Sequence, residues 1–238
     1  MGNTVRTLTL LFNQEIAPYE VSMFRGCILD AMKDKSDVLL HNHPEHGFRY
    51  SYPLVQYKRI RGHAALVCVN MGSEAIVPLF NEKLFDFKLG ERPVQMEVES
   101  VRPQSMHIQT WNDEFKYNIR KWIPLNTENY KVYQQMEGLV EKMTFLEKIL
   151  TGNILSFAKG IDVHFDKEVT CKLLKLSDPF IVKVKGTRVM AFDATFSTNV
   201  SLPDYIGLGK HPSFGFGTIH KAIRHEKEES VVDNINTI

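Results

Sequence analysis

The amino-acid sequence predicts an α+β fold that is divided between two domains. The chain has 238 residues, which suits one large or two small domains with enough length to bury a core. Its first half contains segments in the order strand, helix, strand, strand, helix, strand, which is the βαββαβ arrangement. Its second half combines strands with a long amphipathic helix. We expect the domains to comprise residues 1–104 and 105–238.

In the first half, strands are predicted where β-branched and apolar residues follow one another: residues 4–12, 49–57, 63–70 and 96–102. A hairpin turn at Arg61-Gly62 is expected between the second and third strands. Helices are predicted over residues 19–33 and 73–82. The buried face of the first helix is indicated by apolar residues at helical spacing, namely Val21, Phe24, Ile28 and Met32.

In the second half, the sequence predicts two helices. Asn126 or Thr127 is expected to cap the first, which begins at Glu128. Residues 137–159 carry apolar side chains along one stripe that is interrupted at Gly152. Such a stripe is typical of core packing rather than of a cofactor site.

The strands of the second half surround a turn at Asp178-Pro179. Residues 169–176 and 180–185 are predicted to pair with each other across this turn. Residues 188–200 alternate apolar and polar side chains, as expected of a strand with one buried face. The charged tail that begins at Glu226 is expected to be loosely ordered.

The composition narrows the function classes. Hydrophobic residues make up 43% and charged residues 24%, which is ordinary for a soluble globular protein. The N-terminal residues lack a signal-peptide pattern and no apolar run reaches about 18 residues, so we expect a cytoplasmic protein without a membrane segment. The three cysteines, Cys27, Cys68 and Cys171, lie far apart in apolar settings and are expected in the core rather than in disulfides or a zinc site.

The net charge is only +1, so any nucleic-acid site needs a local concentration of positive charge. Three clusters can supply it: Lys58-Arg59-Ile60-Arg61, Arg120-Lys121 with Lys116, and Lys210-His211. Each cluster by itself is typical of a solvated surface. Only their convergence on one surface would indicate a binding site.

The most informative stretch is GLGKHPSFGFG, residues 207–217, in which two glycine-hydrophobic-glycine triplets are separated by five residues. Glycines allow the backbone to approach a ligand closely, and successive amide groups in such a loop can bind an anion. The spacing matches neither a P-loop nor a dinucleotide-binding motif. The alternative is a glycine-rich hairpin between two strands.

The doubled triplet, followed by a short apolar strand at 218–222, resembles the signature of the RAMP superfamily. More closely, the chain is similar to the CRISPR repeat-processing endoribonucleases of the subtype I-B type. This resemblance implies two ferredoxin-like βαββαβ domains in tandem, with the glycine-rich loop holding RNA backbone.

Three histidines, His41, His43 and His46, fall around Pro44 and Gly47, which predicts a loop between a helix and a strand. Histidine suits proton transfer because its pKa lies near neutrality. The resemblance implies that a protein of this kind cuts precursor CRISPR RNA without metal or cofactor. In that reaction the ribose 2′-hydroxyl attacks the adjacent phosphate and leaves a 2′,3′-cyclic phosphate and a 5′-hydroxyl.

The resemblance assigns roles to four catalytic residues. His41 and His43 form the acid–base pair, Tyr50 positions one of them or the ribose, and Lys33 neutralises charge on the phosphorane. Without the resemblance, Lys33 is explained as a cation at a helix C-terminus, and His46 and Tyr52 are alternatives one step away.

The expected RNA-binding residues are the loop glycines, two adjacent polar residues, and basic residues near residue 60: Gly207, Gly209, Gly215, Gly217, Lys210, His211, Lys58, Arg59 and Arg61. The expected partners are a precursor CRISPR RNA repeat, further subunits of a CRISPR interference complex, and a second copy of the chain. Two rival functions stay open. One is a subunit that binds RNA without cutting it, and the other is a metal-dependent phosphodiesterase with His41, His43 and His46 as ligands.

Overall fold

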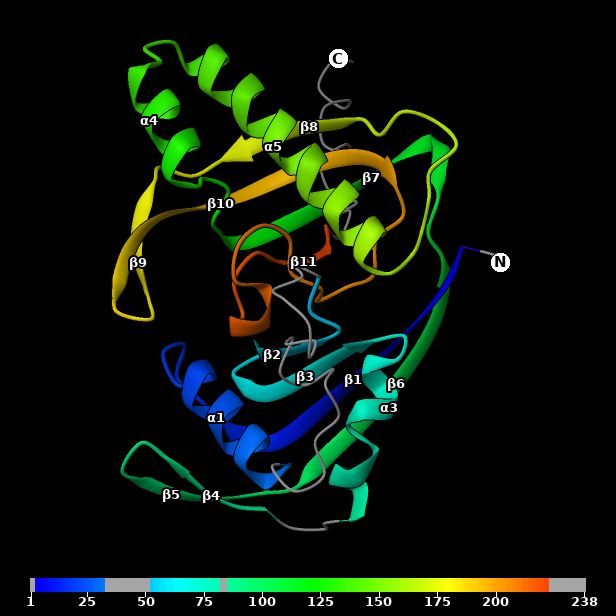
Figure 1. Cartoon of the computed structure of the whole chain (residues 1–238), viewed down its shortest axis with the longest axis vertical. Coiled ribbons are helices and arrows are strands. Elements are labelled where there is room, and N and C mark those ends of the chain that lie inside the picture. The colour runs from blue at the N-terminus through cyan, green and yellow to red at the C-terminus, as the bar shows by residue number, and fades with distance from the viewer. Residues whose placement is uncertain (1–2, 33–51, 82–84, 223–238) are drawn as a thin grey trace, which may run out of the picture.

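The computed structural model describes residues 3–32, 52–81 and 85–222, which form two stacked α+β halves (Figure 1). In the N-terminal half, an antiparallel 4-stranded sheet has the strand order β2-β3-β1-β6. Its strands are β1 (Thr4–Glu15), β2 (Val55–Ile60), β3 (His63–Val69) and β6 (Val98–His107). Helix α1 (Val21–Ala31) covers one face, and the predicted residues Val21, Phe24, Ile28 and Met32 are all buried.

The second crossover of this half differs from a single helix. It contains the short helix α3 (Gly72–Ala75), the 3₁₀ turn η1 (Val77–Asn81) and a hairpin of β4 (Phe85–Leu89) and β5 (Arg92–Met96). The sequence analysis did not predict this hairpin, because the charged residues in its short strands obscure the apolar pattern that indicates a strand. Phe85 anchors it to the core, with its ring centroid 6.1 Å from that of Phe12.

The C-terminal half repeats the topology around a 5-stranded sheet, in which the order along the main path is β11-β7-β10-β8. Its strands are β7 (Thr110–Trp122), β8 (Cys171–Leu176), β9 (Phe180–Val184), β10 (Thr187–Val200) and β11 (Thr218–Lys221). Helices α4 (Thr127–Gln135) and α5 (Leu139–Gly160) form the first crossover. The glycine-rich stretch, with the 3₁₀ turn η2 (Pro212–Phe214), takes the place of the second helix. The two halves are therefore tandem ferredoxin-like domains, as predicted.

The helices of the C-terminal half follow the sequence pattern in part, because three residues of the apolar stripe expected over residues 137–159 are exposed: Leu139, Val140 and Leu155. The Asn126 side chain accepts a 2.7 Å hydrogen bond from the Asn129 amide and so caps α4. Helix α5 buries Leu146, Leu150, Ile154 and Phe157 along one face. The helix itself continues through the exposed Gly152 without a break.

The predicted pairing of the two strands around Asp178-Pro179 is also wrong. Both β8 and β9 pair with β10, each along a different part of that long strand. Proline lacks the amide that a strand ladder needs, so Pro179 interrupts the strand instead of reversing it. The actual reversal lies at Lys185-Gly186, where both residues have positive φ.

The chain passes from one sheet to the other between β6, which ends at His107, and β7, which begins at Thr110. Residues 103–105, next to the expected domain boundary, pair with β1 inside β6. Strand β3 is buried on both faces, which explains its continuous apolar run. Its residues Ala64, Leu66 and Cys68 join the core under α1. Its alternate residues Ala65, Val67 and Val69 join the core of the C-terminal half.

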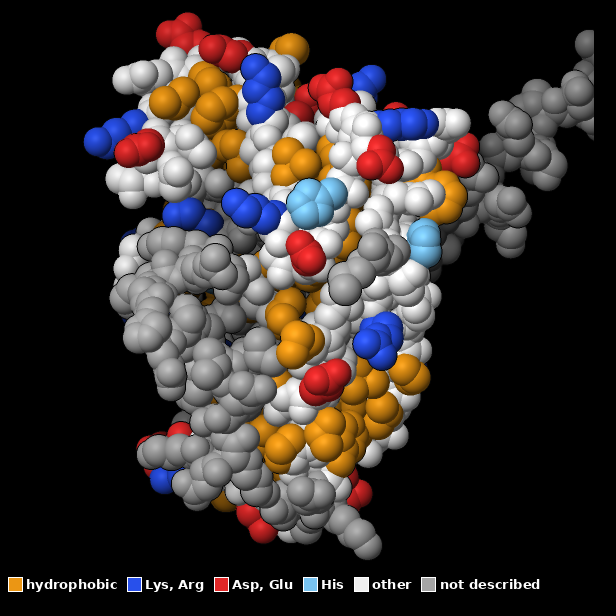
Figure 2. Space-filling model, turned by 45° about the vertical axis from the view of Figure 1, so that its right-hand side comes forward, with side chains coloured by type: hydrophobic (Ala, Val, Ile, Leu, Met, Phe, Trp, Pro, Cys, Tyr) orange, Lys and Arg blue, Asp and Glu red, His pale blue; other side chains and the backbone are white. Residues whose placement is uncertain are grey.

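On the face shown in Figure 2, acidic and basic side chains are interspersed, in agreement with the small net charge. Among the helices of the described ranges, none is both long and apolar enough to cross a membrane. The three cysteines are free thiols, of which Cys68 is buried and Cys27 and Cys171 are partly buried.

We predict that Gly152→Ala stabilises the protein. A Cβ at this position meets nothing within 4 Å, and alanine restricts the unfolded chain and favours the helix. The expected gain in the free energy of unfolding is about 0.5–1 kcal/mol, measured by urea denaturation. A loss of stability would contradict the continuous path of α5.

Candidate nucleic-acid interface

The glycine-rich stretch lies between the two halves, against β2. Residues alternate faces along a strand, so Val55 and Tyr57 point into the core under α1 while Gln56 and Lys58 point toward the C-terminal half. Both polar side chains hydrogen-bond to this stretch. The Gly207 amide donates a 2.9 Å hydrogen bond to Gln56 Oε1. The side chains of β2 therefore hold the glycine-rich stretch in place.

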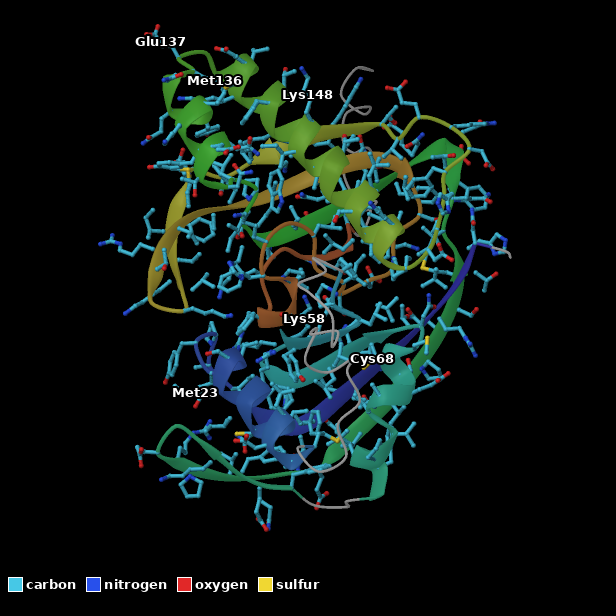
Figure 3. The ribbon with its side chains drawn as sticks, viewed as in Figure 1. Met23, Lys58, Cys68, Met136, Glu137 and Lys148 are labelled. Carbon is cyan, nitrogen blue, oxygen red and sulfur yellow. The ribbon has the colours of Figure 1, made fainter. Side chains whose placement is uncertain are left out.

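Lys58 makes the second of these connections. Its Nζ donates to the Pro212 carbonyl at 3.0 Å and to Thr218 Oγ1 at 3.2 Å. The side chain is 0% exposed and lies between the two halves (Figure 3). Burial lowers the pKa of Lys58 to about 7, because the charged form loses its hydration. Lys58 is thus a buried structural residue, which differs from the expected surface cation for RNA.

Tyr52 makes the third connection. Its hydroxyl donates a 2.9 Å hydrogen bond to the Gly207 carbonyl, and its ring packs edge-on against Phe157 of α5, with centroids 5.0 Å apart. Burial raises the pKa of the Tyr52 hydroxyl well above its ordinary value. Tyr52 therefore stays a neutral donor, and Gly207 is bound through both its backbone amide and its backbone carbonyl.

The glycines are required by close packing. Gly217 has φ +60°, and a Cβ there would collide with the carbonyl oxygen of Leu208. Gly209 has φ +87° and lies against the Trp122 ring, where a Cβ would stand only 2.9 Å from Nε1. A side chain at either position would thus force the loop away from its neighbours.

Many amides of this stretch are already used within the protein. Those that donate to protein acceptors belong to Gly207, Leu208, Lys210, Phe214, Gly215 and Gly217. The acceptors include the carbonyls of Ile123 and Lys121 at the end of β7. The expectation of a cradle of free amides therefore applies only to the remaining positions, and side chains become the main groups for binding an anion.

A cleft of about 700 Å³ adjoins this stretch between the two halves. The N-terminal half contributes Arg59 and Arg61 from the β2–β3 hairpin. The C-terminal half contributes basic residues from β7 and β11, which are Arg120, Lys121, His220 and Lys221. Tyr205, Phe214 and Phe216 provide aromatic surface. Two of the three basic clusters noted in the sequence thus converge on one surface.

Acidic residues set part of the charge of this cleft. Asp193 accepts 2.8 Å and 2.7 Å hydrogen bonds from Arg120 Nη1 and the Lys121 amide. Lys121 has a lowered pKa, caused first by burial and then by the nearby Arg59 guanidinium. Cations from the two halves therefore lie close enough to repel one another, which favours an anionic ligand between them.

Lys210 and His211 lie at the turn before η2. Lys210 is exposed, and His211 is partly buried with φ 57°. Burial lowers the pKa of His211, and the positive charges of Lys210 and Lys185 lower it further. His220 in the cleft also has a lowered pKa, through burial and then Arg120. Both imidazoles are accordingly neutral near pH 7 and can accept or donate a hydrogen bond.

The four expected catalytic residues, Lys33, His41, His43 and Tyr50, lie outside the described residues, as does His46. Within the described ranges, no group of three or more His, Cys, Asp or Glu side chains is placed to hold a metal ion.

Sequence reasoning missed the roles of Gln56 and Tyr52. A usable signal was present, because Gln56 and Lys58 alternate with Val55 and Tyr57 along the strand. Polar residues at every second position of such a strand indicate a second, polar contact face.

We predict that Lys58→Met removes a pH-dependent part of the stability. The pKa of Lys58 is about 7 in the folded protein and about 10.5 otherwise, so the unfolded chain binds more protons between these values. The wild-type free energy of unfolding should therefore rise with pH across this window relative to the variant. Urea denaturation from pH 6.5 to about 9.5 measures the difference. Parallel curves would show that Lys58 is not buried as described.

We also predict that Gly217→Ala destabilises the protein far more than Gly186→Ala. Both glycines have positive φ, but only Gly217 meets backbone at the Cβ position. The control should therefore lose only about 1 kcal/mol from backbone strain, while Gly217→Ala should also displace the Leu208 carbonyl. Thermal unfolding of both variants gives the comparison, and equal losses would refute the packing argument.

Comparison with known proteins identifies the family. The model of the Cas6b N-terminal domain matches residues 3–107, and that of the Cas6b C-terminal domain matches residues 109–222. An uncharacterized protein of Methanocaldococcus jannaschii is 40% identical over 101 residues, which covers 42% of this chain and 67% of that protein.

Solved structures agree over nearly the whole chain. A crystal structure of Cas6b superposes with a TM-score of 0.81 and 25% identity, covering 92% of this chain and all of the other. A structure described as the CRISPR RNA processing endoribonuclease Cas6b gives a TM-score of 0.71 at 23% identity over the same shares. Since the two domain models together span residues 3–222 apart from position 108, the chain belongs to the Cas6b family.

Proposed function

We propose that this chain is a metal-independent endoribonuclease that cuts precursor CRISPR RNA within its repeats. The main support is the convergence of Arg59, Arg61, Arg120 and Lys121, from both halves, on a cleft beside the glycine-rich stretch. Membership of the Cas6b family and a structural relative described as a CRISPR RNA processing endoribonuclease support the choice of substrate.

RNA binding in this proposal is carried by side chains that surround the cleft. Arg59, Arg61 and Lys210 are exposed and can pair with phosphates, and His211 can hydrogen-bond to the ribose or a phosphate. Lys58 is not among them because it is buried. The glycines at 207, 209, 215 and 217 contribute through the loop shape that brings Lys210 and His211 to the surface.

The proposed chemistry is transesterification. One of His41 and His43 takes the proton of the 2′-hydroxyl, and the other gives a proton to the departing 5′ oxygen. Tyr50 orients one of the two histidines, and Lys33 stabilises the charge of the phosphorane. The products are a 2′,3′-cyclic phosphate and a 5′-hydroxyl. Strand β2 begins soon after these residues and contributes Arg59 to the cleft, so the chain connects the proposed catalytic segment directly to the RNA-binding surface.

The test is cleavage of a labelled CRISPR repeat from the same genome in the presence of EDTA. The wild-type protein should make one cut that ends in a cyclic phosphate. His41→Ala and His43→Ala should each slow the cut by about 10²- to 10⁴-fold, the usual effect of losing a general acid or base. His164→Ala is the matched control, since His164 is exposed in the loop between α5 and β8.

Two other results would overturn the proposal. Tight binding of an intact repeat, unchanged in the histidine variants, would make the chain an RNA-binding subunit of a CRISPR complex. Cleavage that EDTA abolishes would instead indicate a metal-dependent phosphodiesterase.

A further inference from the structure

Two cations from separate parts of the chain lie over the ring of Phe214 of η2. The Arg25 guanidinium carbon lies over its ring, 4.9 Å from the centroid, and the Lys185 Nζ lies 5.3 Å from the same centroid. Arg25 belongs to α1 of the N-terminal half, whereas Lys185 is in the β9–β10 turn of the C-terminal half. Figure 1 shows this hairpin reaching toward α1 beside η2.

Lys210 and His211 complete the group. The His211 ring packs edge-on to Phe214, with centroids 6.2 Å apart, and Lys210 precedes it in the chain. Burial lowers the pKa of His211, and the positive charges of Lys210 and Lys185 lower it further. Arg25 also lies over the Tyr57 ring, 5.7 Å from its centroid, which fixes its stem against the core.

Gathering like charges costs electrostatic energy unless an opposite charge is supplied. The ion pairs found in the described ranges are Lys88–Glu91, Arg92–Glu20 and Arg120–Asp193, and none of them includes Arg25, Lys185 or Lys210. Contacts with the Phe214 ring hold the cations in place by cation–π attraction and leave their donors for a ligand. The chemistry that matches them is a phosphate group, which guanidinium and ammonium groups bind with charge-assisted hydrogen bonds.

We propose that Arg25 and Lys185, which lie over the Phe214 ring, form together with the neighbouring Lys210 a phosphate-binding site for the backbone of the RNA where it leaves the cleft. The inference rests on the proposed function and extends it to Arg25 and Lys185, which do not line the cleft. Phe214 lines the cleft as well, so its ring is the shared wall between the two cationic surfaces. Here Phe214 supports cations rather than stacking on a base, because cations already lie over its ring.

Both halves contribute to this site, so it is complete only when they are docked. RNA bound there would connect α1 to the β9–β10 hairpin through one strand of phosphates. The binding of RNA is therefore expected to stabilise the docked arrangement by mass action.

The test is the salt dependence of binding between the full-length protein and a labelled repeat RNA, measured by fluorescence anisotropy. Arg25→Gln and Lys185→Gln should each reduce the slope of log K against log salt by about 0.7, the value for one phosphate contact on a single strand. If the variant and the wild type bind equally at about 1 M salt, this difference in slope makes the variant bind roughly fourfold more weakly than the wild type at about 0.15 M salt. Phe214→Leu, which keeps an apolar side chain but removes the ring, should weaken binding in the same direction.

Lys148→Gln is the matched control, because Lys148 is an exposed cation on α5, far from η2 (Figure 3). It should change neither the affinity nor the slope. Thermal unfolding of each variant checks that the fold is intact. Lys185→Gln should disturb the fold least, because Lys185 is exposed on a turn.

Unchanged slopes in the Arg25 and Lys185 variants, with the repeat still cut by the wild type, would refute this site and leave the proposed function standing. Reduced slopes with no cutting by the wild type would support the site while removing the endonuclease. Titration with pyrophosphate distinguishes RNA from a free phosphate compound as the ligand. The assignment to RNA would be overturned if the variants lost pyrophosphate binding but bound the repeat RNA as the wild type does.

Discussion

The structure depends on one row of hydrogen bonds that connects Tyr52 and strand β2 to the glycine-rich stretch. Tyr52, Gln56 and Lys58 bind the carbonyl or amide of Gly207 and the carbonyl of Pro212 across the junction of the halves. Burying these polar groups would be costly if they were unpaired, so their pairing selects one relative position of the domains. Lys58 strengthens this selection, because its buried amino group loses its hydration and depends on the Pro212 carbonyl as a hydrogen-bond partner.

The glycine-rich stretch therefore has a structural role before any role in binding. It replaces a helix that would otherwise complete the second ferredoxin-like domain, and it fits between β2 and the end of β7 because its glycines lack side chains. Many of its amides serve the junction itself. It contributes to ligand binding by placing Lys210, His211 and Phe214 on the side where both halves meet.

The small net charge is compatible with nucleic-acid binding because the positive charge is concentrated. Arg59 and Arg61 come from one half, and Arg120 and Lys121 from the other, so the cleft acquires its charge only from the docked domains. Asp193 holds Arg120 and the Lys121 backbone in position rather than neutralising the whole surface. Folding thus produces a local potential that the composition alone does not suggest.

The sequence by itself determined most of the elements and their order, because burial on one face leaves a periodic pattern along the chain. The α1 and α5 stripes, the Asn126 cap and the Arg61-Gly62 turn were all readable in this way. The charged β4–β5 hairpin and the pairing partner of β9 were not, because strand pairing joins residues that are remote in the sequence. Only the tertiary structure decided that Lys58 is buried while Arg59 lines the cleft, since adjacent strand residues face opposite sides and the second domain covers just one of them.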